Sequence, residues 1–412
     1  AVMENELTGT IPTELGDLTQ LSVLNMFSNC FSGTIPSSLG NLQLLKIYNL
    51  ANNFLTGPAD NLLLSPSILY FYMSSNYLTG DFPFVEQLCA ANSLLSVLLS
   101  DNLLAGSISS CIGNWSIVNT IDLSGNMFDG SLPSTVAQLI NLQTLSIASN
   151  LFTGVLTGSL NANLVTVDIS DNAFSGPLPF NSYAHSVNTQ LKTFVAVKNC
   201  FTGSIPEHIC SAVSLETLEL SGLTAGKSCV QGTFIFNMKI QVATAFAGSI
   251  PACIFSMPNL TQFSLSGNAI KSQLYDIPAS SNLVNISLSN NRLYGSIPAT
   301  IQERNKFELL DLSFNRLKGT TVSHIPTHPV LPVVLVVILL QFIWRVIVYQ
   351  ALFHLHFQTL VRQLIFWMVI RFHVTREMSC LRVTLIRTNI FVALMSLTTL
   401  FLHSSGAFWW YV

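Results

Sequence analysis

The chain has 412 residues, of which 50% are hydrophobic and only 9% are charged, against roughly 25% charged residues in ordinary soluble domains. Residues 1–320 hold 11 basic and 19 acidic residues, a net charge of −8, whereas residues 321–412 hold six Arg and one Glu, a net charge of +5. Because nucleic-acid binding needs a concentrated basic face, the acidic first part sets that class of partner aside. So little charge indicates a surface of Asn, Ser and Thr, a segment in lipid, or both.

The chain opens at Ala1 inside a repeated unit, without the charged and apolar stretch of a signal peptide. We therefore expect the N-terminus to be a fragment boundary, which makes the missing signal uninformative about secretion.

A unit of 23 or 24 residues recurs along residues 1–320. Its first half reads LxxLxL, as in LQTLSIASN ending at Asn150, and its second half reads NCFSGTIPSSLGNL from Asn29 or NRLYGSIPATI from Asn291. The Asn recurs at positions 5, 29, 53, 76, 102, 126, 150, 172, 199, 268, 291 and 315, while Leu223 and Thr244 occupy the same slot in two degenerate units. We count about fourteen units, the first of them truncated.

Each half of the unit predicts a local structure. The LxL segment predicts a short strand whose leucines point into a core shared with neighbouring coils. The Asn turns the chain, and an inward amide can satisfy backbone groups of the next coil. Gly33 and Pro36 show the second half: Gly permits a tight bend, and Pro fixes an extended stretch. The predicted ladder comprises Asn29, Asn53, Asn76, Asn102, Asn126, Asn150, Asn172, Asn199, Asn268, Asn291 and Asn315.

The combined pattern LxxLxLxxNxLxGxIPxxLGxL resembles the plant-type leucine-rich repeat of receptor kinase ectodomains, receptor-like proteins and secreted inhibitors of cell-wall-degrading enzymes. The resemblance covers residues 1 to about 320. It implies an α/β repeat fold, a right-handed leucine-rich-repeat solenoid with a parallel concave sheet and irregular or 3₁₀ segments on the convex side. No HRD or DFG kinase signature occurs in the sequence, and the fold alone names no ligand.

The predicted concave face changes character along the chain. Its first coils expose apolar and aromatic side chains, and later coils expose Thr, Ser and Asp. Aromatic clusters with polar rims are typical of binding surfaces, although the same side chains could simply pack against each other along the sheet. The candidate ligand-binding residues are Val23, Asn25, Phe27, Ile47, Asn49, Tyr70, Tyr72, Leu98, Asp122 and Asp168.

The segment of residues 223–251 departs from the repeat, because it loses the Asn twice and the regular LxxLxL once. Repeat decay into an irregular coil or local kink is the simpler interpretation. The alternative is an excursion from the solenoid that touches a ligand, since loops on rigid scaffolds often carry function.

Cysteines and sequons bear on the compartment. Cys89 and Cys111 lie on the non-strand side of successive units, which suggests a disulfide in an oxidising compartment, with buried free thiols as the alternative. Asn114, Asn259 and Asn285 begin N-x-S/T sequons and are possible glycosylation sites in a secreted chain. Cysteine and histidine spacings give no zinc motif, and the sequence predicts neither a metal nor a cofactor.

A catalytic site is not indicated. The carboxylates that project from predicted strands come from different coils, without a histidine or nucleophile beside them in the pattern. His185 and His208 are the histidines of the first 320 residues, and both fall outside the strands. We therefore predict that the protein is not an enzyme.

After Gly319 the repeat stops and the composition becomes strongly apolar. Residues 330–353 hold a single charge, Arg345, and are long enough for one transmembrane helix in a hydrophobic C-terminal tail, residues 321–412. Two further apolar runs are too short for confident spans. The alternative is that the residues after about 320 are not genuine coding sequence, as after intron read-through or a frameshift.

Taken together, the sequence predicts a non-enzymatic recognition module at the cell surface. Resemblance to receptor-like proteins implies a protein, peptide or glycan partner on the concave face, with the membrane contacted through the tail. If the tail is an artefact, the protein would be secreted. The alternative function is structural or adhesive, without a discrete ligand.

Overall fold

The computed structural model describes residues 1–59, 65–81, 90–156, 163–180, 190–223, 229, 232–235, 238–241 and 246–320. All of these lie within Ala1–Val337, the first of two compact units. The predicted transmembrane segment, residues 330–353, lies outside the described residues. Within the part described, no helix has the length and apolar character needed to cross a membrane.

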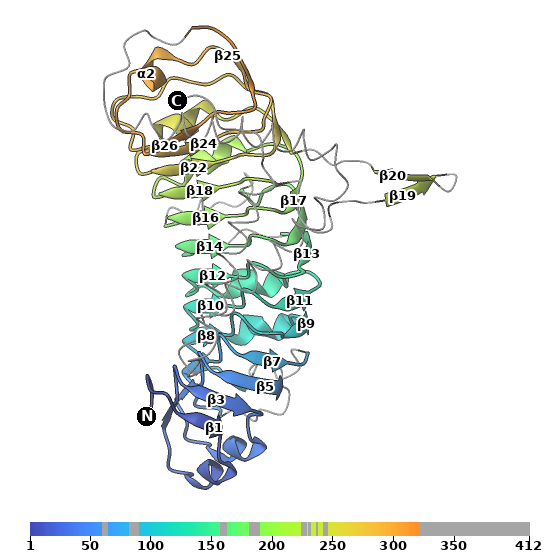
Figure 1. The fold of residues 1–412 in the computed structure, drawn as a ribbon, viewed down its shortest axis with the longest axis vertical. Helices are drawn as coiled ribbons and strands as arrows, with labels where there is room; N and C mark the ends of the chain where they lie inside the picture. Colours follow the sequence, from blue (N-terminus) through green and yellow to red (C-terminus); the bar gives the residue numbers. More distant parts are fainter. Residues whose placement is uncertain are drawn as a thin grey trace, which may run out of the picture. The chain divides into compact units, whose positions relative to one another are not determined.

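A twelve-stranded parallel sheet, here called the main sheet, runs through the described coils (Figure 1). Every strand in it has three residues, and in each of them the middle side chain is buried or half-buried while the outer two face away from the core, as a strand's alternation requires. The strands are β2 (Val23–Asn25), β4 (Ile47–Asn49), β6 (Tyr70–Tyr72), β8 (Ser96–Leu98), β10 (Thr120–Asp122), β12 (Thr144–Ser146), β14 (Thr166–Asp168), β16 (Thr193–Val195), β18 (Thr217–Glu219), β22 (Gln262–Ser264), β24 (Asn285–Ser287) and β26 (Leu309–Asp311).

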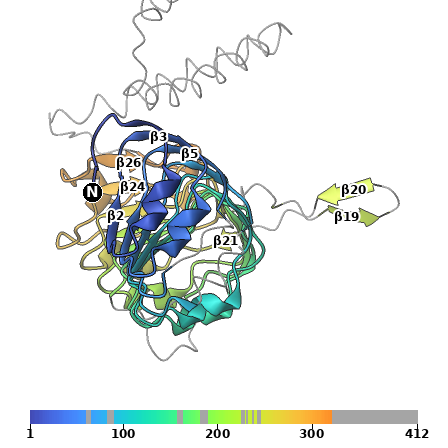
Figure 2. The same cartoon turned by 90° about the horizontal axis from the view of Figure 1, so that it is seen from below.

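Short helices follow the Ile-Pro motif of the repeat, as predicted for the side of the coil away from the main sheet. A proline in extended conformation precedes most of them, such as Pro36 with φ −65° and ψ 133° before η2. Viewed along the stack, β2, β24 and β26 gather on one side of the coils (Figure 2). The helices are η1 (Thr13–Asp17), η2 (Ser37–Asn41), η3 (Ser110–Asn114), η4 (Ser134–Gln138), η5 (Glu207–Ser211), η6 (Ala252–Ser256) and the α-helix α2 (Ala299–Gln302).

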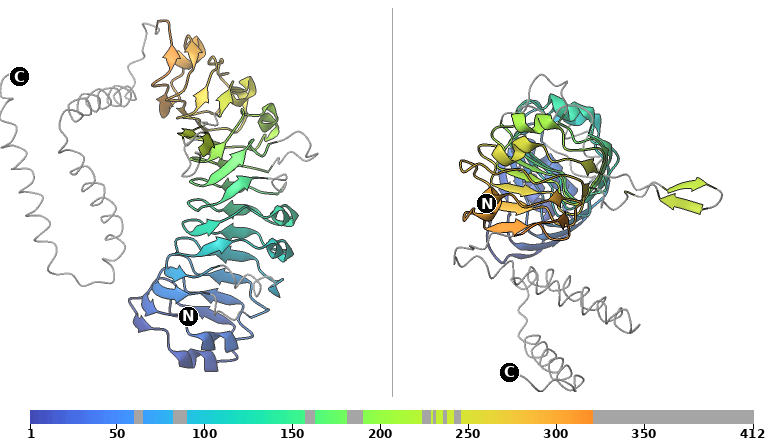
Figure 3. Two further views of the ribbon diagram at one scale, coloured as in Figure 1. Left: turned by 90° about the vertical axis from the view of Figure 1, so that its right-hand side faces the viewer. Right: turned by 90° about the horizontal axis from the view of Figure 1, so that it is seen from above.

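A second set of small parallel sheets, which the sequence pattern did not predict, is formed by the residues just after each ladder Asn (Figure 3). These strands contain the predicted glycine bend: Gly33 has φ +77°, and a Cβ there would lie 2.9 Å from Thr10 Cγ2. The sheets are β1 (Thr8–Thr10), β3 (Cys30–Gly33), β5 (Phe54–Pro58) and β7 (Tyr77–Thr79); β9 (Ala105–Ser107) and β11 (Met127–Asp129); β13 (Thr153–Val155), β15 (Ala173–Gly176) and β17 (Cys200–Phe201); β21 (Ala247–Gly248) and β23 (Ala269–Ile270); β25 (Tyr294–Gly295) and β27 (Arg316–Leu317).

The predicted inward orientation of the ladder Asn side chains is confirmed. In Asn53, Nδ2 donates to the carbonyl oxygens of Met26, Leu50 and Ala51 at 3.0–3.2 Å, and Oδ1 accepts from the Phe31 amide at 3.1 Å. The same four contacts, to its own coil and the preceding one, recur at the other ladder positions from Asn29 to Asn315, with two gaps at Leu223 and Thr244. The ladder side chains therefore form hydrogen bonds with backbone groups that water cannot reach.

The two degenerate units that the sequence predicts at Leu223 and Thr244 do not have the same outcome in the structure. Leu223 belongs to a real coil, because its amide donates to Asn268 Oδ1 at 2.9 Å after strand β18. Thr244 lies outside the described residues, and in the main sheet β18 pairs directly with β22. Between these coils the described residues include an antiparallel hairpin of β19 (Gly232–Ile235) and β20 (Met238–Gln241). The chain therefore forms a hairpin outside the main sheet between these coils, and contact of this segment with a ligand stays a prediction.

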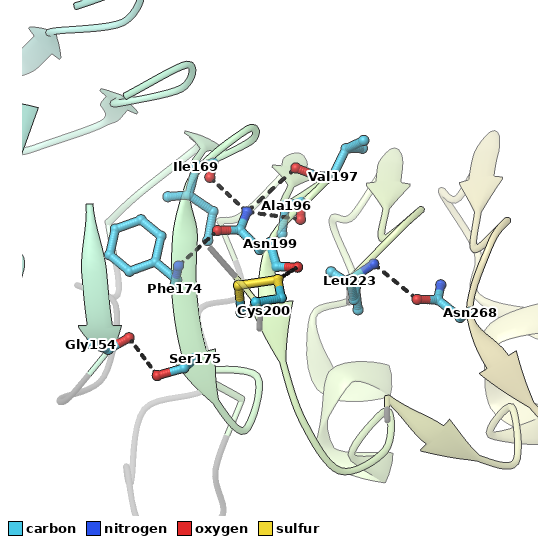
Figure 4. Close-up of a disulfide and its surroundings, with 11 residues drawn as sticks. Gly154, Ile169, Phe174, Ser175, Ala196, Val197, Asn199, Cys200, Leu223 and Asn268 are labelled. Carbon is cyan, nitrogen blue, oxygen red and sulfur yellow. Dashed lines mark hydrogen bonds between the residues drawn. A yellow bond between two sulfur atoms is a disulfide. The ribbon is translucent and has the colours of Figure 1, made fainter. Parts of the chain in front are cut away.

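Two disulfides, neither of them predicted as a pair, lie where the ladder is interrupted. Cys200, next to ladder residue Asn199, bonds to Cys229 (Figure 4), and Cys210 of η5 bonds to Cys253 of η6, with Cα separations of 5.0 and 6.0 Å. Cys111 is also disulfide-bonded. Its pairing with Cys89 stays a prediction, because Cys89 lies outside the described residues. Because disulfides form and persist in oxidising compartments, these bonds indicate that the chain folds in one.

Tyr48 places a polar hydroxyl in the apolar core, and its replacement tests what that burial costs in stability. It is the buried middle residue of β4, and its hydroxyl has no hydrogen-bond partner among the described residues. Burial raises the pKa of this phenol well above its usual value. Because a buried unpaired hydroxyl costs about 1–3 kcal/mol, we expect Tyr48→Phe to raise the free energy of unfolding by about 1 kcal/mol in urea denaturation. A loss of stability would show that the hydroxyl has a partner.

Candidate binding face

The outward side chains of the main sheet form three aligned rows, fixed by the parallel pairing. Strand pairing joins Val23 to Ile47 and Ile47 to Tyr70 in the first row, and Asn49 to Tyr72 and Tyr72 to Leu98 in the second. The third row begins two residues after each strand, as at Phe27. We call this surface the main-sheet face, and it corresponds to the predicted concave face.

All ten candidate ligand-binding residues lie on this face. Val23 is 38% exposed, and the other nine are half-buried. The Tyr70 and Tyr72 rings lie 5.9 Å apart at their centroids, tilted by 58°. The structure therefore brings an apolar cluster together at the first coils, comprising Val23, Phe27, Ile47, Tyr70, Tyr72 and Leu98.

Four of the polar candidates also form local hydrogen bonds at the end of their strands, which the sequence interpretation missed. Asp122 Oδ1 accepts from the amide and hydroxyl of Ser124 at 3.0 and 2.6 Å, and Asp168 does the same with Ser170. Asn25 and Asn49 each accept one amide two residues ahead. These are Asx turns that end the strand. The recurring Asx at a fixed strand position was the signal that could have revealed them.

Glu219 is a face residue that the candidate list omitted. It ends β18 in the same row as Asp168, and Gln262 Nε2 donates to its Oε1 at 2.5 Å. Burial, and after it the charge of Asp168, raises the pKa of the Glu219 carboxyl above its ordinary value of 4.5. A carboxylate at every second strand thus gives this part of the face a negative potential.

The raised pKa sets a pH-dependent test. Since the folded-state pKa lies above the unfolded value, ionisation of Glu219 disfavours the folded state; the penalty is absent at low pH and fully present above the folded pKa. We expect Glu219→Gln to be more stable than wild type at pH 7, with the gain disappearing as the pH falls through the ordinary carboxyl range. The control is Glu216→Gln, which removes the exposed Lys192–Glu216 ion pair and should give no gain. Equal behaviour of both variants would contradict the argument.

In the part of the chain that the structure describes, no group of His, Cys, Asp and Glu could hold a metal ion. His208 lies in η5, away from the main-sheet strands, and His185 lies outside the described residues.

The three sequons lie in different surroundings. Asn114 is exposed at the end of η3, and Asn259 is exposed with Nδ2 donating to Val213 O at 2.9 Å. Asn285 faces outward from β24 on the main-sheet face, half-buried. Glycosylation at these sites stays a prediction.

Comparisons with known proteins agree with this architecture. The family model described as Leucine Rich Repeat matches residues 20–42 and 282–303. Receptor-like protein 35 of Arabidopsis thaliana is 28% identical over 168 residues, which are 38% of this chain and 15% of that protein.

Solved structures match over a longer stretch. The PEPR1–AtPEP1 structure is 30% identical, with a TM-score of 0.64, over 76% of this chain and 41% of that one. The Arabidopsis receptor kinase HAESA, solved with the peptide hormone IDA and the co-receptor SERK1, is 25% identical, with a TM-score of 0.50, over 76% and 61%. The chain thus spans only part of the length of these relatives. With its repeated LxL strands, its Asn ladder and these likenesses, the chain is a leucine-rich-repeat protein of the plant type.

Proposed function

We propose that the chain is a non-enzymatic recognition module that binds a protein, peptide or glycan on the main-sheet face. The observation that carries the proposal is the apolar cluster, in which Val23, Ile47, Tyr70 and Tyr72 occupy outward strand positions that β10, β12 and β14 fill with Thr, Ser and Asp. Leaving such side chains next to water has a free-energy cost that a partner removes, and clustered aromatics are typical anchors of interfaces.

Within this class we favour a peptide. The structural relatives support the choice, because HAESA was solved with a peptide hormone. The rows of the face run along the stack of coils, so a peptide in extended conformation could contact successive strands with successive side chains. A structural or adhesive role without a discrete ligand is the alternative, and it predicts no saturable binding.

We further propose a cell-surface location, with residues 1–320 as the recognition domain and residues 321–412 as a tail that anchors the chain through a helix at 330–353. The disulfides Cys200–Cys229 and Cys210–Cys253 support passage through an oxidising compartment. If the tail is absent from the translated protein, the same module would be secreted. Alkaline carbonate extraction of the expressed full chain tests the anchor, because only an integral protein stays with the membrane.

The binding proposal is tested by selecting ligands for the full chain from a displayed random peptide library and measuring their affinity by fluorescence anisotropy. We expect Tyr70→Ser/Tyr72→Ser to weaken a selected peptide about tenfold or more, since truncating aromatic anchors often costs 2 kcal/mol or more. The control is Ile140→Ser/Val213→Ser, which removes apolar side chains that are 62% and 47% exposed outside the main sheet. Equal affinities for both variants, or no saturable ligand, would contradict the proposal.

A further inference from the structure

The carboxylates of the main-sheet face recur at a regular interval. Asp122 pairs in register with Ser146 and Ser146 with Asp168, and the row continues through Val195 to Glu219. One carboxylate therefore stands on every second strand, at β10, β14 and β18. Since hydrogen-bonded strands lie about 4.8 Å apart, successive carboxylates are separated by about 9.6 Å.

These three carboxylates have no basic partner among the described residues, where the ion pair is that of Lys192 with Glu216. Asp122 and Asp168 each use Oδ1 in an Asx turn, and among the described residues Oδ2 of each has no hydrogen-bond partner. Burial and the charge of Asp168 raise the pKa of Glu219, so a cation bound beside it would relieve an unfavourable charge.

The interval matches one extended peptide conformation. A polyproline II helix has three residues per turn and rises about 3.1 Å per residue, so side chains at i, i+3 and i+6 share one face about 9.3 Å apart. A β-strand places same-face side chains about 6.6 Å apart, and an α-helical turn rises about 5.4 Å. Neither of these spacings fits carboxylates on every second strand.

The same row continues into the apolar cluster. Asp122 pairs in register with Leu98 of β8, and Leu98 with Tyr72 of β6. A peptide that follows the row from Glu219 towards β6 would therefore meet three carboxylates first and then the Tyr70 and Tyr72 rings. This row is charged over β10–β18 and apolar over β6 and β8, which fixes which part of a ligand lies over which coils.

We propose that the main-sheet face binds a peptide in polyproline II conformation, with Lys or Arg at every third residue over β10–β18 and with apolar residues over β6 and β8. This inference rests on the proposed function and specifies the chemistry of its ligand. Charge complementarity gives register and specificity, while the apolar end gives much of the affinity.

The test uses the full chain and three synthetic peptides of identical composition, rich in Pro and ending in the same Leu-Tyr pair. Their three Lys residues stand at every third position, at every second position or side by side. In fluorescence anisotropy we expect the every-third peptide to bind at least about tenfold tighter than either other peptide, because only it can form all three ion pairs together. Equal affinities for the three peptides, or binding by none of them, would overturn the inference.

Variants locate the contacts. Asp168→Asn and Glu219→Gln should each weaken the every-third peptide about threefold to fivefold, as expected for exposed ion pairs, and the loss should shrink at high salt. The control Asp129→Asn removes an exposed carboxylate from β11, in another sheet, and should leave the affinity unchanged. An equal loss in Asp129→Asn would overturn the inference. If only uncharged peptides from the random library bind, and still depend on Tyr70 and Tyr72, the inference fails while the proposed function stands.

Discussion

Asn150→Leu is expected to lower the free energy of unfolding by about 4 kcal/mol, or to prevent folding altogether. Asn150 is 1% exposed; its Oδ1 accepts from the Phe128 amide at 3.0 Å, and its Nδ2 donates to the carbonyl oxygens of Leu123, Ile147 and Ala148 at 2.9–3.2 Å. Leucine has a similar volume but leaves these backbone groups unpaired, and each buried unpaired group costs about 1–3 kcal/mol. Because these contacts join the coil of Asn150 to the preceding coil, the loss weakens that junction most.

Urea denaturation followed by circular dichroism measures this effect. The matched control is Asn141→Ala, which removes an exposed Asn whose Nδ2 makes one contact, to Ser116 O at 2.7 Å, and should cost at most about 1 kcal/mol. If both variants lost the same small amount of stability, the ladder would not be the device that joins the coils.

Cys210→Ala/Cys253→Ala is expected to lower the free energy of unfolding by about 4 kcal/mol. The bond closes a loop with a sequence separation of 43 residues, and the chain-entropy model assigns about 4 kcal/mol to a loop of that length. The bond joins η5 to η6 across the segment where β18 pairs with β22 and Leu223 replaces the ladder Asn. Its loss should therefore loosen this junction first.

The measurement is urea denaturation of wild type and variant, with and without dithiothreitol. Proteolysis should cut the variant between residues 223 and 246 before it cuts elsewhere. The single variant Cys210→Ala serves as the control, because it should lose as much stability as the double variant if the bond, and not the thiol packing, is responsible. A double variant as stable as wild type would contradict the role given to the bond.

The coil could be predicted well from the sequence because the residues that determine it lie within one unit and recur along the chain. The LxL strands, the inward Asn and the proline before a short helix recur in most units, so an error at one position is corrected by comparison with the other units. The second set of sheets was missed because its strands, such as β3 and β9, contain Ser and Gly and show no apolar alternation. Their pairing comes from stacking of the coils.

The site was predicted less completely. The apolar cluster was placed correctly because strand alternation fixes which side chains face outward. The Asx turns of Asp122 and Asp168 depend on hydrogen bonds that the pattern does not display. The pKa of Glu219 is raised by burial and, after it, by the charge of Asp168, and both arise only when the coils stack. The partner of Cys200 lies within the irregular segment and the partner of Cys210 just beyond it, where the repeat spacing no longer indicates which coils are neighbours.

The most direct test of ligand binding on the main-sheet face is photocrosslinking with benzoylphenylalanine placed at one position at a time. A peptide selected against the full chain is bound to a protein with the probe at Tyr70, on the face, or at Ile140, which is exposed outside the main sheet. After irradiation, mass spectrometry should find the peptide attached at position 70, competed away by unlabelled peptide, and not at position 140. Specific crosslinks at position 140 with none at position 70 would contradict the account.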